Sequence, residues 1–228
     1  MLFLNIMHEG GPVMWIILVC SVVASVIFIE RLFYLHRVQI NVGDLVRGLV
    51  NVLKRNSVVE AISLCDDTPG PAAHVLRAAI LAFENGDDDL NQAVEDAALG
   101  ETPKLVTRMK LLATIAYITP LLGLLGTVLG MINLFHTIME KGAMVNASHL
   151  AKGVGEALYT TAAGLCVAIP CFVAYNYLVS RIESISLDME KASSEIIYFF
   201  KRNGDKLRKA MKDAKKSSAA KDKAERTA

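Results

Sequence analysis

Three stretches without a single charged residue constrain this chain more than any other feature of its sequence. They cover residues 13–29, 111–135 and 157–180. The hydrocarbon core of a bilayer is about 30 Å thick, and a helix needs roughly 20 apolar residues to cross it. A soluble domain would spread its apolar residues along amphipathic elements, whereas this chain gathers them in blocks. The sequence therefore predicts an all-α membrane protein with three transmembrane helices.

The first stretch has the length of a secretory signal peptide, but its flanks differ from those of one. Residues 1–12 contain no Lys or Arg, so the basic region that precedes the apolar part of a signal peptide is missing. Glu30 and Arg31 follow the stretch directly. We therefore expect residues 13–29 to be an uncleaved membrane anchor.

The distribution of basic residues predicts the orientation of the chain in the membrane. Residues 1–12 contain no Lys or Arg and the hairpin 136–156 contains two, whereas residues 30–110 contain nine and residues 181–228 contain thirteen. Cytoplasmic segments are enriched in Lys and Arg next to the spans. We therefore expect the N-terminus and the 136–156 hairpin to be periplasmic, and the 30–110 region and the C-terminus to be cytoplasmic.

Both predicted cytoplasmic segments carry helical patterns. Residues 30–110 contain short helical stretches separated by turns, and the last of them is expected to run from Asp89 toward Lys110 with an interruption near Gly100 and Pro103. Residues 181–211 should continue the third span as a cytoplasmic helix. Two of the spans are therefore expected to extend into a cytoplasmic helical bundle. The basic residues 212–228 lack large apolar side chains and are expected to be disordered.

The second and third spans are unusually rich in small and hydroxyl residues. Small residues let helix backbones approach closely, and hydroxyl groups can bond across helices or to water. The candidates for close packing, within the chain or against a partner helix, are Gly123, Gly126, Gly130, Ala157, Gly164 and Ala168. Thr127 and Thr161 lie on the same faces. They either support packing or line a polar path, and the residues alone leave both interpretations open.

Glu156 is the ionisable residue that most directly indicates a function. It lies at the start of the third span, one turn before Thr160 and Thr161. A desolvated carboxyl has a raised pKa and can load and release a proton. The alternative is an interfacial glutamate that is solvated or caps the helix. The pair Glu30–Arg31 is better explained as a marker of the membrane boundary.

The sequence contains no constellation typical of a soluble enzyme. It has no phosphate-binding loop, no H-E-x-x-H motif and no G-x-S-x-G motif. Its four cysteines form no C-x-x-C pair and, with the histidines, no zinc spacing. We therefore predict a protein that is not an enzyme and has no catalytic residues, metal site, cofactor or nucleic-acid partner.

Two linked motifs carry a family resemblance that spans nearly the whole chain. The first is the run from Ala116 to Met131, AYITPLLGLLGTVLGM. The second combines Gly155–Leu158 with Thr161–Leu165, Ala168–Pro170 and Tyr175–Asn176. Together they resemble the second and third spans of the MotA/TolQ/ExbB proton-channel family. With three predicted spans, the chain is similar to the ExbB and TolQ type, and general similarity favours ExbB slightly.

The resemblance implies a function and a set of partners. The resemblance implies that such subunits form pentamers in the bacterial inner membrane. Each pentamer would enclose a one-span ExbD/TolR-type protein that bears an essential aspartate. Proton flow past that aspartate would drive rotation of the partner within the ring and deliver work to a TonB/TolA-type protein. By resemblance, Thr127 and Thr161 would face the aspartate, Glu156 would lie on or near the proton path, and the small residues would pack against the partner helix.

Three other functions compete with that of an ExbB-type motor subunit. A TolQ-type subunit would serve cell-envelope maintenance by the same mechanism. A secondary transporter would have its own substrate site, but such proteins usually have more spans and internal repeats, and neither is evident here. In a purely structural membrane scaffold, the small-residue faces would serve assembly alone.

Overall fold

The computed structural model describes residues 11–87, 89–142 and 146–225 of the chain. Over these residues it consists of helices and contains no strand. The helices are α2 (Gly11–Val38), α3 (Val42–Lys54), α4 (Val58–Asp67), α5 (Pro71–Asn85), α6 (Leu90–Val106), α7 (Met109–Lys141) and α8 (Ala147–Glu225). Three of them, α2, α7 and α8, contain segments long and apolar enough to cross a membrane. The predicted all-α fold with three spans is confirmed.

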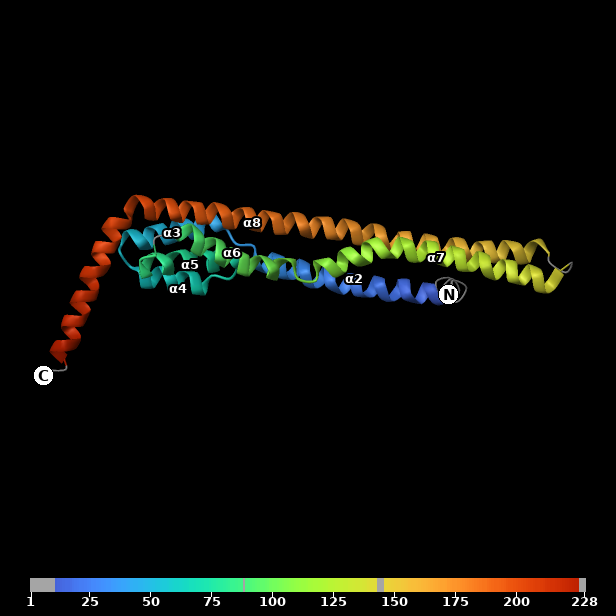
Figure 1. The fold of residues 1–228 in the computed structure, drawn as a ribbon, viewed down its shortest axis with the longest axis horizontal. Coiled ribbons are helices and arrows are strands. Elements are labelled where there is room, and N and C mark those ends of the chain that lie inside the picture. The colour runs from blue at the N-terminus through green and yellow to red at the C-terminus, as the bar shows by residue number, and fades with distance from the viewer. Residues whose placement is uncertain (1–10, 88, 143–145, 226–228) are drawn as a thin grey trace. The chain divides into compact units, whose positions relative to one another are not determined.

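The chain divides into two compact units (Figure 1). Unit 1 comprises residues 1–33 and 107–180, and unit 2 comprises residues 34–106 and 181–228. The first part of α8 belongs to unit 1 and its second part to unit 2. The predicted periplasmic segment 1–12 lies almost entirely outside the described residues, as do residues 143–145 of the predicted hairpin and the last three residues of the tail.

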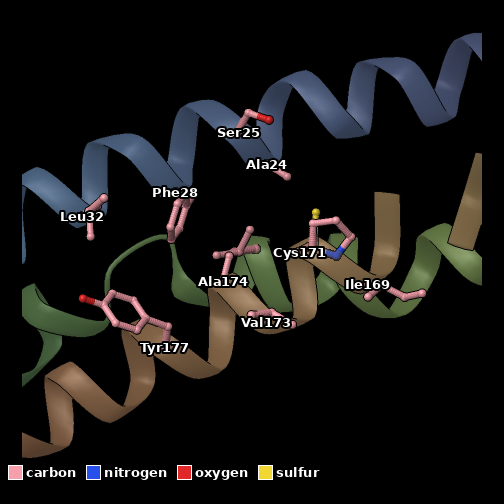
Figure 2. Close-up of a pocket in the computed structure, with 11 residues that line it drawn as sticks. Ala24, Ser25, Phe28, Leu32, Ile169, Cys171, Val173, Ala174 and Tyr177 are labelled. Atoms are coloured by element: carbon pink, nitrogen blue, oxygen red, sulfur yellow. The ribbon is translucent and has the colours of Figure 1, made fainter. Parts of the chain in front are cut away.

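Unit 1 contains α2, α7 and the first part of α8, and large apolar side chains cover its surface. Val26, Leu121 and Val173 are each more than 60% exposed, one from each of the three helices. Exposed apolar surface on this scale is typical of a membrane or protein interface. On one side, α2 and α8 leave an apolar groove between them (Figure 2).

Unit 2 packs α3 to α6 against the second part of α8 around a core of large side chains. Leu49, Leu76 and Ile196 are completely buried. The rings of Phe83 and Phe200 stack with their centroids 4.2 Å apart. This unit has the side-chain core of a soluble helical bundle, in which apolar burial supplies most of the stabilisation.

The start of α6 follows the local rules of helix capping, whereas its end departs from our expectation. The Asp89 carboxylate accepts the backbone N–H groups of Asn91 and Gln92, as expected for an acidic residue before a helix. The predicted interruption near Gly100 and Pro103 is wrong, because α6 continues through both to Val106. Leu105, only 1% exposed, holds the turn after the proline in the core. Tertiary packing therefore overrides the local signal.

The chain breaks instead between α6 and α7. Arg108 precedes α7 in the left-handed region with φ = 63°, which a non-glycine residue rarely adopts. At the other end of the chain, α8 extends to Glu225, where the sequence predicts a disordered tail from residue 212. Alanine and lysine are strong helix formers, which accounts for a helix in this segment. Disorder of the tail in solution stays a prediction.

Candidate functional site

The helices α7 and α8 run antiparallel in unit 1 and approach each other along a row of small residues. A Cβ atom built on Gly130 would lie 2.9 Å from the Cβ of Ala157, and one built on Gly126 would lie 2.5 Å from the Thr160 hydroxyl oxygen. Real Cβ atoms do not come this close to other atoms. Only glycine therefore permits this helix spacing, in agreement with the role of small residues in membrane helix packing.

The contact continues toward the other end of the two helices. A Cβ on Gly123 would lie 3.1 Å from the Cα of Thr161, and one on Gly164 would lie 2.8 Å from the carbonyl oxygen of Thr119. Each glycine thus faces the backbone of the opposite helix. Along this row the residue numbers of α8 increase while those of α7 decrease, so the two helices are antiparallel.

Thr161 makes a hydrogen bond between the two helices. Its hydroxyl donates to the carbonyl oxygen of Gly123 at 3.0 Å. The side chain is half-buried. The hydroxyl oxygen keeps two lone pairs that can accept a hydrogen bond from another group. Thr161 therefore places a polar atom at an interface made otherwise of backbone and small apolar groups.

Thr127 lies on α7 next to the tightest part of this contact. It follows Gly126 directly, and its hydroxyl donates to the Leu124 carbonyl of its own helix at 2.6 Å. Its side chain is half-buried. The hydroxyl is thus satisfied inside its own helix and keeps its acceptor capacity for a neighbouring group.

Glu156 is half-buried and lies at the end of the same row, directly before Ala157. Because Ala157 packs against Gly130, Glu156 is at the level of α7 one turn beyond Thr127. Thr161 therefore lies in the α7–α8 contact, and Thr127 and Glu156 directly adjoin residues of it along the chain. Their role in proton transfer stays a prediction.

The six predicted packing residues also lie in or beside this contact. Gly123, Gly126, Gly130, Ala157 and Gly164 contact the opposite helix of the same chain, and Ala168 is 5% exposed. The structure therefore gives the first five residues an intrachain role. Their contact with a partner helix stays a prediction.

The predicted site residues include Thr161 but not the two most deeply buried hydroxyl residues of the contact. Thr160 is 1% exposed and donates to the carbonyl of Ala157, and Thr119 is fully buried and donates to the carbonyl of Ile115. Both hydroxyl groups thus donate their hydrogen bond within their own helix. The spacing of Thr160 from Ala157 and Gly164 would have placed it on the same face.

Comparison with known proteins identifies the family. The model of the MotA/TolQ/ExbB proton channel family matches residues 68–191, more than half of the chain. This range contains α7 and the part of α8 that packs against it. The chain belongs to the MotA/TolQ/ExbB proton channel family.

The curated relatives are of the ExbB type. The putative biopolymer transport protein ExbB-like 1 of Synechocystis is 33% identical over 200 residues, which cover 83% of this chain and 76% of the relative. The biopolymer transport protein exbB1 of Vibrio cholerae is 31% identical over 178 residues, 76% of this chain and 78% of its own. The ExbB protein of Aquifex aeolicus is 44% identical over 92 residues, 40% of this chain and 62% of its own.

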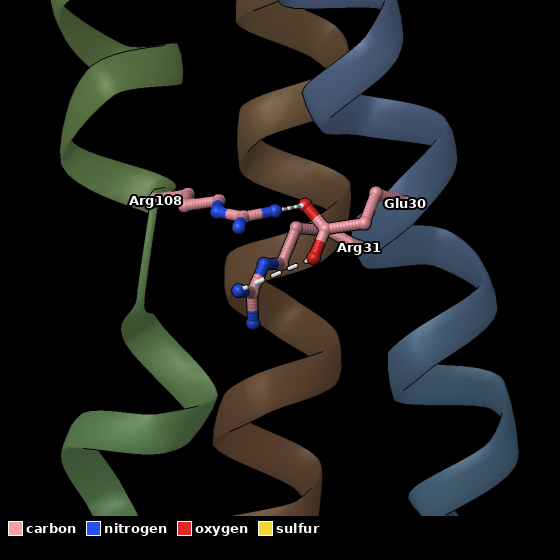
Figure 3. Close-up of polar contacts among 3 residues, drawn as sticks. All are labelled: Glu30, Arg31 and Arg108. Carbon is pink, nitrogen blue, oxygen red and sulfur yellow. Dashed lines mark hydrogen bonds and ion pairs between the residues drawn. The ribbon is translucent and has the colours of Figure 1, made fainter.

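This family member has a second polar cluster, at the boundary between its charge-free and charged segments. Glu30 of α2 pairs with the neighbouring Arg31, with a nitrogen–oxygen distance of 3.6 Å, and with Arg108 at the start of α7 (Figure 3). Arg31 is 5% exposed. The pairing joins the ends of two spans and holds Arg108 next to α2, so Glu30 does more than mark the boundary.

No local sequence pattern indicates the Glu30–Arg108 pair, because the two residues are far apart along the chain. The family model leaves out α2 altogether, since it begins at residue 68. Only the folded chain shows that a glutamate at the end of the first span pairs with an arginine at the start of the second.

Proposed function

We propose that this chain is the proton-channel subunit of an inner-membrane complex that converts the proton motive force into work at the outer membrane. Membership of the proton channel family and the biopolymer transport names of the ExbB-type relatives support this function. In the proposal, the chain forms a homo-oligomer, a pentamer, around a one-span ExbD-type partner. The work passes to a TonB-type protein.

The observation that carries the proposal is the α7–α8 contact with its hydroxyl groups. Residues 111–135 and 157–180 contain no Asp, Glu, Lys or Arg, yet half-buried threonines lie beside the packed backbones. Hydroxyl groups can relay hydrogen bonds to a proton carrier but cannot themselves hold a charge at physiological pH. A titrating carboxyl within the spans must therefore come from another chain, and an aspartate in the partner helix supplies it.

In this mechanism each of the three predicted residues has its own task. Thr127 and Thr161 accept or donate hydrogen bonds to the partner aspartate as it changes its protonation state. Glu156, at the end of the row, passes protons between the periplasmic side and the threonines. The free energy comes from the membrane potential, which contributes about 2.3 kcal/mol for each elementary charge moved through 100 mV. Several protons are needed for one mechanical stroke.

The orientation follows from the basic residues. With 22 of the 24 Lys and Arg residues in the segments 30–110 and 181–228, those segments are cytoplasmic in the proposal, and the N-terminus and the 136–156 hairpin are periplasmic. Glu156 then lies toward the periplasm, where protons enter. Protons leave on the cytoplasmic side.

A TolQ-type subunit for cell-envelope maintenance would use the same residues, and the partner decides between the two. A purely structural scaffold would need the glycines for assembly but would not need the threonine hydroxyls. Isosteric substitutions that remove only the hydroxyl or the charge therefore separate motor from scaffold.

The test combines co-purification with proton-dependent uptake in cells. The full chain is purified together with the one-span, aspartate-bearing protein encoded beside it, and the mass of the intact complex is measured. The variants Thr127→Val, Thr161→Val and Glu156→Gln are then compared for assembly and for energised uptake of a TonB-dependent substrate. Thr114→Val is the matched control, because the exposed Thr114 hydroxyl bonds only to the Lys110 carbonyl of its own helix.

The proposal predicts that all four variants assemble and that uptake is lost in the first three but kept in the control. Intact uptake in all three would remove the proposed proton path. Uptake that requires a TolA-type rather than a TonB-type protein would assign the chain to the TolQ type.

A further inference from the structure

The groove between α2 and α8 is lined almost entirely by apolar groups. Its volume is about 620 Å³, and Phe28 and Leu32 of α2 face Ala174 and Tyr177 of α8 across it (Figure 2). The Ser25 hydroxyl at its edge donates to the Ser21 carbonyl of its own helix. The groove thus offers mainly dispersion contacts along its length, which suit an apolar occupant.

The length of the groove matches one leaflet of a bilayer. On α2 it extends from Ala24 to Leu32, and on α8 from Ile169 to Tyr177. At a rise of about 1.5 Å per residue, each stretch covers about 12 Å. Half of a hydrocarbon core of about 30 Å is about 15 Å. An acyl chain that enters at the membrane surface would therefore fill the groove and end near the middle of the bilayer.

One end of the groove lies beside the cluster of Glu30, Arg31 and Arg108. Arg31 precedes the lining residue Leu32, and Arg108 lies one helical turn before the lining residue Leu112. The Arg108 side chain is 56% exposed, and its guanidinium has more N–H groups than its pairing with Glu30 uses.

We propose that this groove binds one acyl chain of an anionic phospholipid, with the lipid phosphate at Arg108. Arginine suits a phosphate because its planar donors pair with two oxygens at once. The apolar groove and the cationic end have the same order as the tail and headgroup of a lipid. The inference requires only that unit 1 lies in a membrane, and it is independent of proton transport.

A neighbouring copy of the chain is the main competing occupant. A helix from another subunit would cover the apolar groove but would also have to bring a hydrogen-bond acceptor to the exposed Arg108 guanidinium. A phospholipid meets both requirements in a single molecule. The exposed guanidinium at the end of the groove therefore favours the lipid.

The test is native mass spectrometry of the full chain, extracted with its complex from membranes, with bound lipids counted per subunit. Ser25→Trp places a bulky ring in the groove, and Val26→Trp places the same ring on the next residue of α2, which is 62% exposed and does not line the groove. We expect retained phospholipid to fall by about one molecule per chain in Ser25→Trp and to stay unchanged in Val26→Trp.

The headgroup is tested by adding phosphatidylglycerol or phosphatidylcholine to the delipidated wild-type complex. One arginine near the headgroups should enrich the anionic lipid about five-fold over the zwitterionic one. Arg108→Gln should abolish the enrichment. Glu30→Gln breaks the same ion pair but keeps the cation, so it should preserve or increase the enrichment.

Three results would overturn the proposal. The first is equal lipid retention in Ser25→Trp and Val26→Trp. The second is binding without preference for phosphatidylglycerol, since that would make the groove a site for any lipid tail. The third is a change of oligomer mass in Ser25→Trp with unchanged lipid, which would assign the groove to a second copy. If Ser25→Trp fails to fold, the wild-type lipid titration and the Arg108 variant still decide the outcome.

Discussion

The two units of this chain pack their helices by opposite means. In unit 1, α7 and α8 meet through glycines whose backbones touch the opposite helix, and large apolar side chains point outward. In unit 2, the large side chains point inward, as Leu49 and Leu76 do. The difference follows from the solvent. In water the hydrophobic effect drives apolar side chains together, whereas lipid provides no such driving force. Membrane helices therefore rely on close backbone contact and hydrogen bonds.

The largest effect is expected in the core of unit 2. Leu76→Ala should lower the free energy of unfolding by about 2–5 kcal/mol, because Leu76 is completely buried and its loss leaves a cavity. Leu99→Ala, at a residue that is 65% exposed, should change it by less than about 0.5 kcal/mol. Urea unfolding of the full chain in detergent micelles, followed by circular dichroism, measures both. Equal losses would mean that unit 2 lacks the core described.

The second effect contrasts two glycine-to-alanine substitutions. Gly126→Ala should destabilise the α7–α8 contact by about 1–3 kcal/mol, since the new methyl group would overlap Thr160. Gly100→Ala, in α6 with no atom near the added Cβ, should stabilise the chain by up to about 1 kcal/mol. Titration with a denaturing detergent measures the first and urea unfolding the second. The same sign at both positions would remove the proposed difference between the units.

A third, smaller effect concerns the hydrogen bond between the spans. Thr161→Val keeps the shape of the side chain and removes the donor to the Gly123 carbonyl, which should cost about 0.6 kcal/mol, the average for such bonds in a membrane protein. Thr161→Ser should retain most of the stability. Titration with a denaturing detergent compares the stability of Thr161→Val and Thr161→Ser, with Thr114→Val as the control. A loss in Thr114→Val as large as in Thr161→Val would show that the contact between helices is not the cause.

The smallest effect near neutral pH belongs to Cys65 in unit 2. Burial, with a contribution from Asp66, raises the pKa of this thiol from 9.0 to about 11. The folded state therefore holds a proton that the unfolded state loses above pH 9, and stability should fall as the pH rises from about 9 to 11. Cys65→Ala should show a shallower decline in urea unfolding over that range. Parallel pH profiles would contradict the raised pKa.

The sequence predicts most of what depends on local pattern. Charge-free stretches identify the three spans, and three- and four-residue spacing identifies the small-residue faces of α7 and α8. The Asp89 cap is also a local feature. Each of these follows from residues within a few turns of one another.

The sequence could not predict features that depend on long-range packing. Nothing near Glu30 indicates Arg108, because the pair forms only when α2 and α7 lie together. The helix break falls at Arg108 and not at Pro103, because Leu105 anchors the end of α6 in the core. The groove depends on three helices at once. Such features follow from tertiary contacts that no local pattern contains.

Proton flux through the reconstituted complex tests the central claim most directly. The full chain and its aspartate-bearing partner are placed in liposomes with a pH-sensitive dye inside, and a membrane potential is applied. The account predicts flux for the wild type and for Thr114→Val, and only the leak of empty vesicles for the assembled Thr127→Val/Thr161→Val double variant. Undiminished flux in that double variant would contradict the account.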